Sequence, residues 1–221
     1  MGIRSIRSED PFSGLTNTEN SDILLSNFLT ERVPEMIIPF QGKYPKIDPS
    51  AFVAENALVI GDVEIGPDTS IWFYSVIRGD TNAIRIGSRC NIQDACVLHV
   101  GERHPTILED EVSLAHRVVV HGCRLKKRCL IGIGAIVLNG AEIGEEAVVG
   151  AGSLVAPQTI IPPRTLAMGV PAKPVRPLRE EDFYMVNHTI EDYQKLKEIY
   201  RSLSRSRKDS SRHTKKRSGR Q

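Results

Sequence analysis

The chain has 221 residues, a net charge of +2 and 40% hydrophobic residues, which is typical of a globular protein with one sizeable core. No apolar run approaches the roughly eighteen residues that span a bilayer, so no membrane partner is expected. The opening segment MGIRSIRSED lacks the apolar stretch of a secretory signal. The sequence therefore predicts a cytoplasmic protein.

The first 35 residues are polar apart from a small apolar patch between Ile23 and Leu29. They lie outside the periodic pattern that dominates the rest of the chain. We expect residues 1–35 to form an N-terminal arm.

A six-residue repeat occupies residues 36–176. Neither the 3.6-residue period of a helix nor the alternation of an ordinary strand gives such a repeat. A parallel β-helix does, because each hexapeptide forms a short strand and a corner, and three hexapeptides close one coil. Eighteen units predict about six coils. The repeating positions are Val53, Val59, Ile65, Ile71, Ile77, Ile86, Ile92, Leu98, Ile107, Ser113, Val119, Leu125, Ile131, Val137, Ile143, Val149, Val155 and Ile161, of which Ser113 alone is not aliphatic.

Two steps of this ladder are nine residues long, near residues 78–85 and 100–106. Interruptions of a solenoid usually form loops on one face, often the functional face.

All four cysteines, Cys90, Cys96, Cys123 and Cys129, lie two residues before an aliphatic position, where other repeats place Ala, Ser or Thr. Their spacing is therefore that of the repeat. We expect small buried thiols, and neither a disulfide framework nor a thiolate zinc site.

Histidines form the strongest candidate site. His99 and His121 are one coil apart once the second insertion is counted, so they should stack on the same face of adjacent coils. His116 lies nearly one strand before His121, around a corner. Three neutral imidazoles are a known catalytic zinc set, but here the third would have to come from a neighbouring chain, which implies a closed cyclic trimer. The other three histidines, including His104, are expected to be ordinary surface residues.

Residues 177–203 are predicted to form a C-terminal helix. Thr189 and Asp192 suit a capping box at its start. An apolar stripe follows, made of Ile190, Tyr193, Leu196, Tyr200 and Leu203.

The last residues are strongly basic, with nine Lys or Arg and one Asp from position 201 onward. Residues 204–221 are too polar to bury a core and are predicted to be a disordered tail. A nucleic-acid partner is not expected, and only this tail could contact one. The rest of the chain carries 20 basic and 26 acidic residues.

The segments VIRGD (76–80), NIQD followed by VLH (91–99) and SLAHRVVVHGC (113–123) resemble the γ-class carbonic anhydrase family. The resemblance extends from about residue 37 through AMGVPAKPVRPL (167–178) into the C-terminal helix. It implies an all-β fold, a left-handed parallel β-helix of hexapeptide repeats with a C-terminal α-helix, assembled as a homotrimer with metal at the subunit interfaces. The metal would be zinc, with ferrous iron or cobalt as other possibilities.

The resemblance also implies roles for individual residues. His99 and His121 of one chain and His116 of the next would hold the metal, and Gln93 would orient the water or bicarbonate. Arg78 and Asp80 would pair across the trimer interface, and Tyr193 would reach the pocket. The implied reaction is attack of a metal-activated hydroxide on carbon dioxide, which makes the protein a lyase. Residues 36–176 would then be a metal-binding domain.

Two departures from the family pattern concern proton transfer. The most active members carry a glutamate after the RGD-like segment and a longer acidic loop after the first ligand histidine. This chain has Thr81 and the short loop VGERHPT (100–106). Glu102 or His104 could serve as the proton shuttle, the latter because histidine side chains commonly transfer protons near neutral pH.

Two other functions remain open from the sequence. One is a hexapeptide acyltransferase with a single catalytic histidine and an acyl-CoA groove between chains, since the repeat and the GVPAKPVR ending occur there too. The other is a non-catalytic scaffold that keeps the metal.

Overall fold

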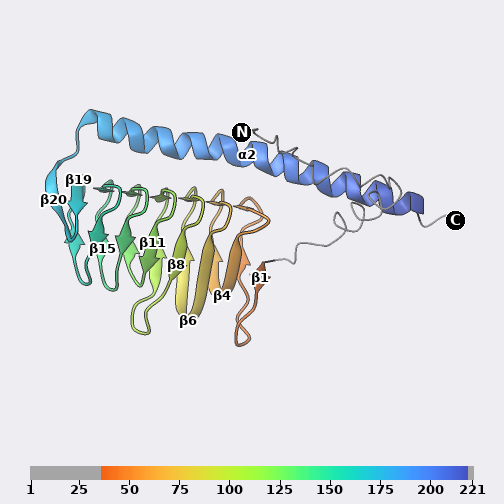
Figure 1. Ribbon diagram of the computed structural model, residues 1–221, viewed down its shortest axis with the longest axis horizontal. Coiled ribbons are helices and arrows are strands. Elements are labelled where there is room, and N and C mark those ends of the chain that lie inside the picture. Colours follow the sequence, from red (N-terminus) through yellow and green to blue (C-terminus); the bar gives the residue numbers. More distant parts are fainter. Residues whose placement is uncertain (1–35, 219–221) are drawn as a thin grey trace, which may run out of the picture. The chain divides into compact units, whose positions relative to one another are not determined.

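The structure is a computed structural model that describes residues 36–218, with side chains described through residue 203. The arm expected at residues 1–35 lies outside the described residues. In the described part of the chain, twenty strands form a parallel β-helix, which one long helix follows (Figure 1). The predicted left-handed hexapeptide β-helix with a C-terminal α-helix is confirmed. No helix in the described range is both long and apolar enough to cross a membrane.

The coil has three faces, and within each face the strands of successive coils pair in parallel. The first face contains β1 (Ile37–Ile38), β4 (Leu58–Ile65), β6 (Val76–Ile86), β8 (Val97–His99), β11 (Val119–His121), β14 (Ile136–Val137) and β17 (Leu154–Val155). The second contains β2 (Lys46–Ile47), the later halves of β4 and β6, β9 (Thr106–Leu108), β12 (Arg124–Leu125), β15 (Glu142–Ile143) and β18 (Ile160–Ile161).

The third face contains β3 (Phe52–Val53), β5 (Ser70–Ile71), β7 (Asn91–Ile92), β10 (Ser113–Leu114), β13 (Leu130–Ile131), β16 (Val148–Val149) and β19 (Thr165–Gly169). A final strand, β20 (Ala172–Pro177), pairs antiparallel with β19 and ends the sheet. The coil therefore begins ahead of Val53, because β1 and β2 pair with β4, and it ends at Pro177.

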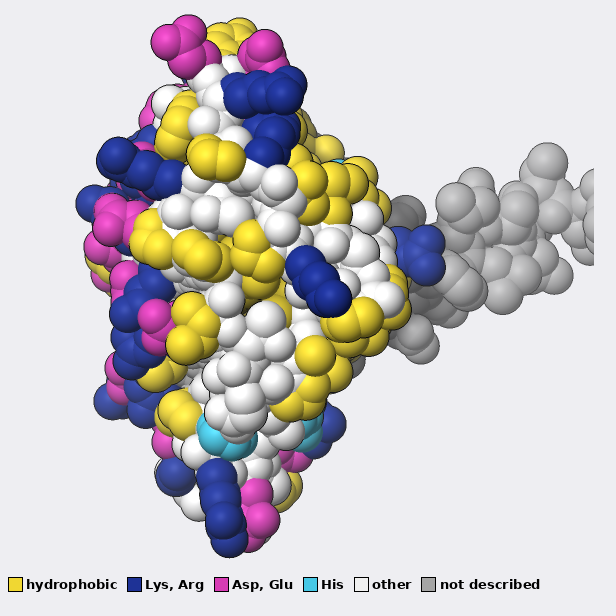
Figure 2. Space-filling model, turned by 90° about the vertical axis from the view of Figure 1, so that its left-hand side faces the viewer, with side chains coloured by type: hydrophobic (Ala, Val, Ile, Leu, Met, Phe, Trp, Pro, Cys, Tyr) yellow, Lys and Arg dark blue, Asp and Glu magenta, His cyan; other side chains and the backbone are white. Residues whose placement is uncertain are grey.

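The three faces differ in the polarity of their outward side chains and in whether the helix covers them. The first carries a column of partly exposed aliphatic residues in register, and we call it the aliphatic face: Leu58, Val76, Val97, Val119, Ile136 and Leu154. The second carries mostly charges, among them Lys46, Glu64, Arg85, Arg124 and Glu142. Charged side chains gather along one side in the view along the coil (Figure 2). The third face lies under the helix.

The predicted ladder of inward residues is confirmed over most of its length and is wrong by one residue over three units. There the buried inward residues are Leu108, Leu114 and Val120, in place of Ile107, Ser113 and Val119. They pair with Ile86, Ile92 and Leu98 of the preceding coil. The second insertion is thus one residue longer than the periodicity suggests, and a shorter step from Val120 to Leu125 restores the register. Gly122 lies in that step with φ of 58°, a left-handed conformation that glycine adopts without strain.

Helix α2 (Glu180–Ser218) begins three residues later than expected and continues through the segment predicted to be a disordered tail. Its start is capped by Asp182, whose carboxylate accepts a hydrogen bond from the Arg179 N–H at 2.7 Å. The capping box proposed at Thr189 is wrong. Thr189 lies inside the helix, where its hydroxyl donates to the Met185 carbonyl at 2.8 Å. Three acidic residues in the first turn favour the earlier start, because negative charge stabilises a helix N-terminus.

Two kinds of contact hold α2 on the third face. Val186 and Ile190 are buried against Leu130 and Val148. Further along, Trp72 meets the rings of Tyr193 and Tyr200 edge-on at centroid distances of 5.3 and 5.2 Å. The expected apolar stripe is therefore partly a packing face, although Leu196 and Leu203 of that stripe are exposed.

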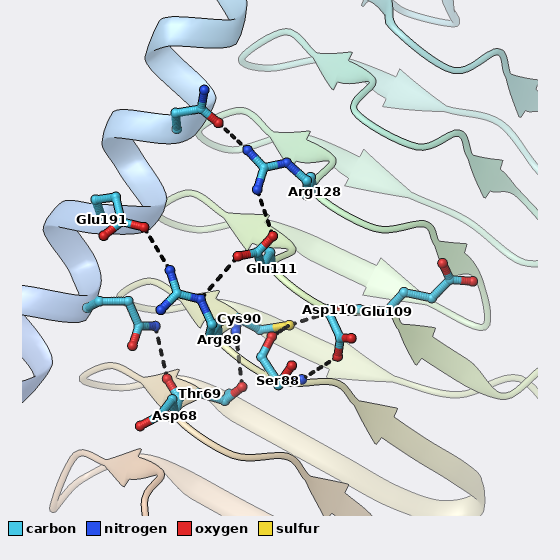
Figure 3. Close-up of polar contacts among 12 residues, drawn as sticks. Asp68, Thr69, Ser88, Arg89, Cys90, Glu109, Asp110, Glu111, Arg128 and Glu191 are labelled. Atoms are coloured by element: carbon cyan, nitrogen blue, oxygen red, sulfur yellow. Dashed lines mark hydrogen bonds and ion pairs between the residues drawn. The ribbon is translucent and has the colours of Figure 1, made fainter.

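A ladder of alternating charges forms the second kind of contact (Figure 3). Successive coils place oppositely charged residues at one corner, each with a left-handed backbone: Asp68, Arg89, Glu111, Arg128, Glu146 and Arg164. Glu111 bridges Arg89 and Arg128 at 3.1 and 2.7 Å. From α2, Glu191 pairs with Arg89 at 2.7 Å, and the nearly buried Lys197 pairs with Asp68 at 2.7 Å.

The inward ladder should supply most of the stability of the coil. Ile143 is fully buried, whereas Ile160, one coil later on the charged face, is 69% exposed. We expect Ile143→Ala to lower the free energy of unfolding by about 2–5 kcal/mol and Ile160→Ala by less than about 0.5 kcal/mol. Denaturant unfolding followed by circular dichroism measures both. Equal losses in the two variants would contradict this account of the core.

Candidate metal site

His99 and His121 stand side by side at the end of the aliphatic face. They are aligned partners of β8 and β11, as the sequence predicted. Nδ1 of His99 lies 3.0 Å from Nε2 of His121, and both side chains are partly buried. The second insertion, residues 100–105, follows His99 and leads to β9.

Each of these rings has a partner on its other nitrogen. Nε2 of His99 lies 2.9 Å from Oδ1 of Asp80, and Nδ1 of His121 lies 2.6 Å from Oδ1 of Asn139. A carboxylate or an amide oxygen only accepts hydrogen bonds, so the proton of each neutral ring belongs on the nitrogen that faces it. The remaining lone pairs, on Nδ1 of His99 and Nε2 of His121, then point at each other.

Two lone pairs at 3.0 Å repel unless a proton or a cation lies between them. A tetrahedral ion with Zn–N bonds of 2.0–2.1 Å separates two nitrogen ligands by about 3.3 Å. A carboxylate or carbonyl behind a ligating imidazole is the usual arrangement around such an ion. The donor atoms and their partners therefore fit a metal ion.

Asp80 keeps its charge in this setting. Burial by itself raises the pKa of Asp80, but hydrogen bonds from His99, the Thr81 N–H and Arg78 outweigh it and lower the pKa to about 2. The predicted pair of Arg78 and Asp80 forms within one chain in the structure. Its role across an interface stays a prediction.

His116 lies at the opposite edge of the aliphatic face, at the corner between β10 and β11. Its Nδ1 is 2.9 Å from Oδ2 of Asp94, which leaves the lone pair on Nε2. The Tyr193 hydroxyl from α2 lies 3.5 Å from that Nε2. Burial, followed by the charge of Asp94, raises the pKa of Tyr193 to about 12, so its hydroxyl keeps its proton at neutral pH.

Gln93 lies next to this corner and not beside the histidine pair. It is buried, and its amide donates to Oδ1 of Asn91 at 3.1 Å. Asn91 in turn donates to the Ser113 hydroxyl at 2.7 Å. These hydrogen bonds to residues of the third face hold Gln93 in place near His116.

The predicted site residues thus form two groups. One edge of the aliphatic face holds Arg78, Asp80, His99 and His121. The opposite edge holds Gln93, His116 and Tyr193. His116 lies in the turn before β11 and His121 at the end of that strand, so the length of β11 separates the two histidines within one chain. Within the described part of one chain, no three His, Cys, Asp or Glu side chains are placed to hold one metal ion.

Asn139 and Asp94 were not predicted from the sequence as partners of the histidines. Asn139 follows His121 by 18 residues, one coil of the repeat. Asp94 precedes His116 by the same 22-residue offset that separates His99 from His121. The coil period would have revealed both residues.

The candidate proton shuttles lie in the loop after His99. Glu102 is exposed and His104 is partly buried. Asn82, in the first insertion, donates to the carbonyl oxygens of Gly101 and Glu102 at 3.3 and 3.1 Å. The two insertions therefore pack together beside the histidine pair. The loop predicted at residues 78–85 is wrong, because these residues belong to the continuous strand β6, and only the second insertion forms a loop.

A thiolate metal site is not supported. All four cysteines are free and buried. Burial raises the pKa of Cys90, Cys96 and Cys123 to about 12, and that of Cys129 well above its ordinary value.

The fold defines a hexapeptide-repeat protein, and its paired histidines offer nitrogen donors that suit a metal ion. A family model described as bacterial transferase hexapeptide (six repeats) matches residues 122–157. A carbonic anhydrase of Geobacillus kaustophilus is 48% identical over 172 residues, covering 78% of this chain and 94% of the relative. A probable carbonic anhydrase of Methanocaldococcus jannaschii is 44% identical, covering 68% of this chain and 94% of the relative. The chain belongs to the γ-class carbonic anhydrase family.

A solved structure from Bacillus cereus, described as a putative acetyltransferase, is also 48% identical and has a TM-score of 0.75. It covers 76% of this chain, and 97% of its own chain is matched.

Thiol reactivity tests whether the four cysteines are free and buried, as the structure places them. The thiolate is the reactive form, and a pKa near 12 leaves very little of it at pH 8. We expect none of the four thiols to react rapidly with Ellman's reagent in the folded protein and all four to react in denaturant. Rapid labelling of one thiol in the folded protein would show that it is exposed or activated.

Proposed function

We propose that the protein is a carbonic anhydrase that interconverts carbon dioxide and bicarbonate at a zinc ion held between two chains of a homotrimer. The histidine pair carries this proposal. Nδ1 of His99 and Nε2 of His121 face each other at 3.0 Å, and the other nitrogen of each ring has an oxygen acceptor. Ferrous iron or cobalt could take the same nitrogen ligands. The cytoplasmic location stays a prediction from the sequence.

The aliphatic face supports the trimer. Its column of six aliphatic side chains stays partly exposed in one chain. A contiguous apolar surface of this kind favours association. Cyclic closure of three copies would bring the His99 edge of each chain to the His116 edge of the next and complete a three-histidine set.

The residues of this chain would divide the work as follows. Zinc in such a site supplies hydroxide at neutral pH by lowering the pKa of a coordinated water to about 7. Asp80 and Asp94 hold the protons on the outer nitrogens of His99 and His116. The Tyr193 hydroxyl, beside Nε2 of His116, can donate a hydrogen bond to an oxygen at the site. Gln93, fixed by Asn91, would orient water or bicarbonate.

The acyltransferase alternative rests on the description of the Bacillus cereus structure. Acyltransfer of that type needs one catalytic histidine and a groove for acyl-CoA, and it has no need of two imidazoles backed by separate acceptors. Saturable binding of acetyl-CoA to the metal-loaded protein would favour this alternative, and its absence would favour carbonic anhydrase.

The metal should depend on the histidine pair and the fold should not. We expect anaerobically purified protein to contain about one zinc or iron per chain. His99→Ala and His121→Ala should each lower this content more than about tenfold, with carbon dioxide hydration falling in parallel. The inward ladder of the coil should keep the variants folded. Metal analysis, circular dichroism and stopped-flow hydration measure the three quantities.

His188→Ala is the matched control, since His188 lies on α2, where it pairs with Asp192 at 2.7 Å. It should keep metal and activity. Wild-type protein without bound metal, or full metal content in His99→Ala, would defeat the proposal.

The shared site can be tested by complementation. His99→Ala and His116→Ala trimers should each lack the metal. After the two are unfolded and refolded together in equal amounts, a site is intact only where a His116→Ala chain meets the His116 of a His99→Ala neighbour. Random closure gives this arrangement at about one interface in four, so metal should return to about a quarter of the wild-type level. No recovery in properly formed mixed trimers would mean that one chain supplies all ligands.

A further inference from the structure

Asn139 lies at the corner after β14, one coil beyond His121. Its side-chain oxygen is 2.6 Å from Nδ1 of His121. No motif in the sequence includes Asn139, and its side chain is uncharged. Its position next to His121 is therefore the feature that points to a role.

The backbone of Asn139 is held by the neighbouring coils on both sides. Its carbonyl accepts a hydrogen bond from the Gln158 N–H at 2.9 Å. The next residue, Gly140, donates its N–H to the Gly122 carbonyl at 2.7 Å. The Asn139 side chain therefore starts from a fixed point relative to His121.

Two glycines leave the space that the amide group of Asn139 occupies. A Cβ atom on Gly122 would lie 2.5 Å from the Asn139 oxygen, and one on Gly101 would lie 3.0 Å from it. The His104 Cβ would be 2.9 Å from that added atom on Gly122. The amide group thus lies close to both glycines, and a side chain at either of them would displace it.

We propose that Asn139 is a positioning residue, which holds the proton of His121 on Nδ1 and directs the Nε2 lone pair toward His99. This inference rests on the proposed function, in which His121 is a metal ligand. The oxygen is the active part of the side chain, because it accepts the Nδ1 proton. A residue that keeps the oxygen should preserve the role, and one that only fills the space should not.

The test compares three substitutions in the full-length trimer. Asn139→Leu removes the acceptor at similar volume, and Asn139→Asp keeps an oxygen in its place. Gln158→Leu is the control, since it makes the same change of amide to aliphatic group one coil further on. We expect Asn139→Leu to weaken zinc affinity about 10–100-fold, with near wild-type affinity in the other two variants. Competition with a chromophoric chelator measures the affinity.

A second readout is the histidine tautomer in the metal-free protein, measured by ¹⁵N NMR with His121 assigned by substitution. Wild type and Asn139→Asp should carry the His121 proton on Nδ1, and Asn139→Leu should show a mixture. Gly101→Ala, which crowds the Asn139 oxygen without replacing the residue, should weaken zinc binding in the same direction. It decides the question if Asn139→Leu does not fold.

The outcomes separate the two proposals. Wild-type protein that binds no zinc would overturn the proposed function. Zinc binding by wild type with equal affinity in Asn139→Leu and Gly101→Ala would overturn the role of Asn139 and leave the function standing. Equal weakening in Asn139→Leu and Asn139→Asp, with an unchanged tautomer, would show that Asn139 acts only through packing.

Discussion

The parallel hydrogen bonds between successive coils are the constraint on which the rest of this structure depends. They fix each strand in register with the strands one coil away, about 4.8 Å apart. Residues separated by one coil therefore stack directly, as His99 and His121 do. Side chains that stack in one column along the coil are consequently in contact and must be compatible with one another. The columns therefore differ from one another in chemistry.

The charged corner shows how the register constrains sequence. Six residues from Asp68 to Arg164 stack there, and like charges at such spacing would repel. The signs alternate, and Glu111 is paired on both sides. Burial by itself raises the pKa of Glu111, but Arg128 and Arg89 hold it below its ordinary value. The same ladder gives α2 its docking points, and through them it places Tyr193 beside His116.

The faces of the coil then have separate tasks. One is covered by α2, one is charged, and the aliphatic face carries histidines at both of its edges. The length of one strand keeps the two groups of histidines apart in one chain. The same apolar column that would draw copies together would also bring the opposite edges of two chains into contact, so assembly and site formation would be one event.

Periodicity alone was enough to predict the β-helix, the stacking of His99 with His121, the position of His116 around a corner and the burial of the four cysteines. These features follow from local repetition, because a register that recurs in every coil appears as a period in the sequence.

The tertiary structure decided the features that the local pattern does not encode. The inward residues Leu108 to Val120 shifted by one position because the second insertion is one residue longer than the periodicity suggests, and the short step with the left-handed Gly122 restores the register. The helix began at Glu180 because Asp182 caps it and Leu130 and Val148 offer an apolar surface to cover. The coil period places Asp94 and Asn139 one coil from their histidines, but only the fold determines that these side chains turn toward the imidazole nitrogens, as that of Asp80 does.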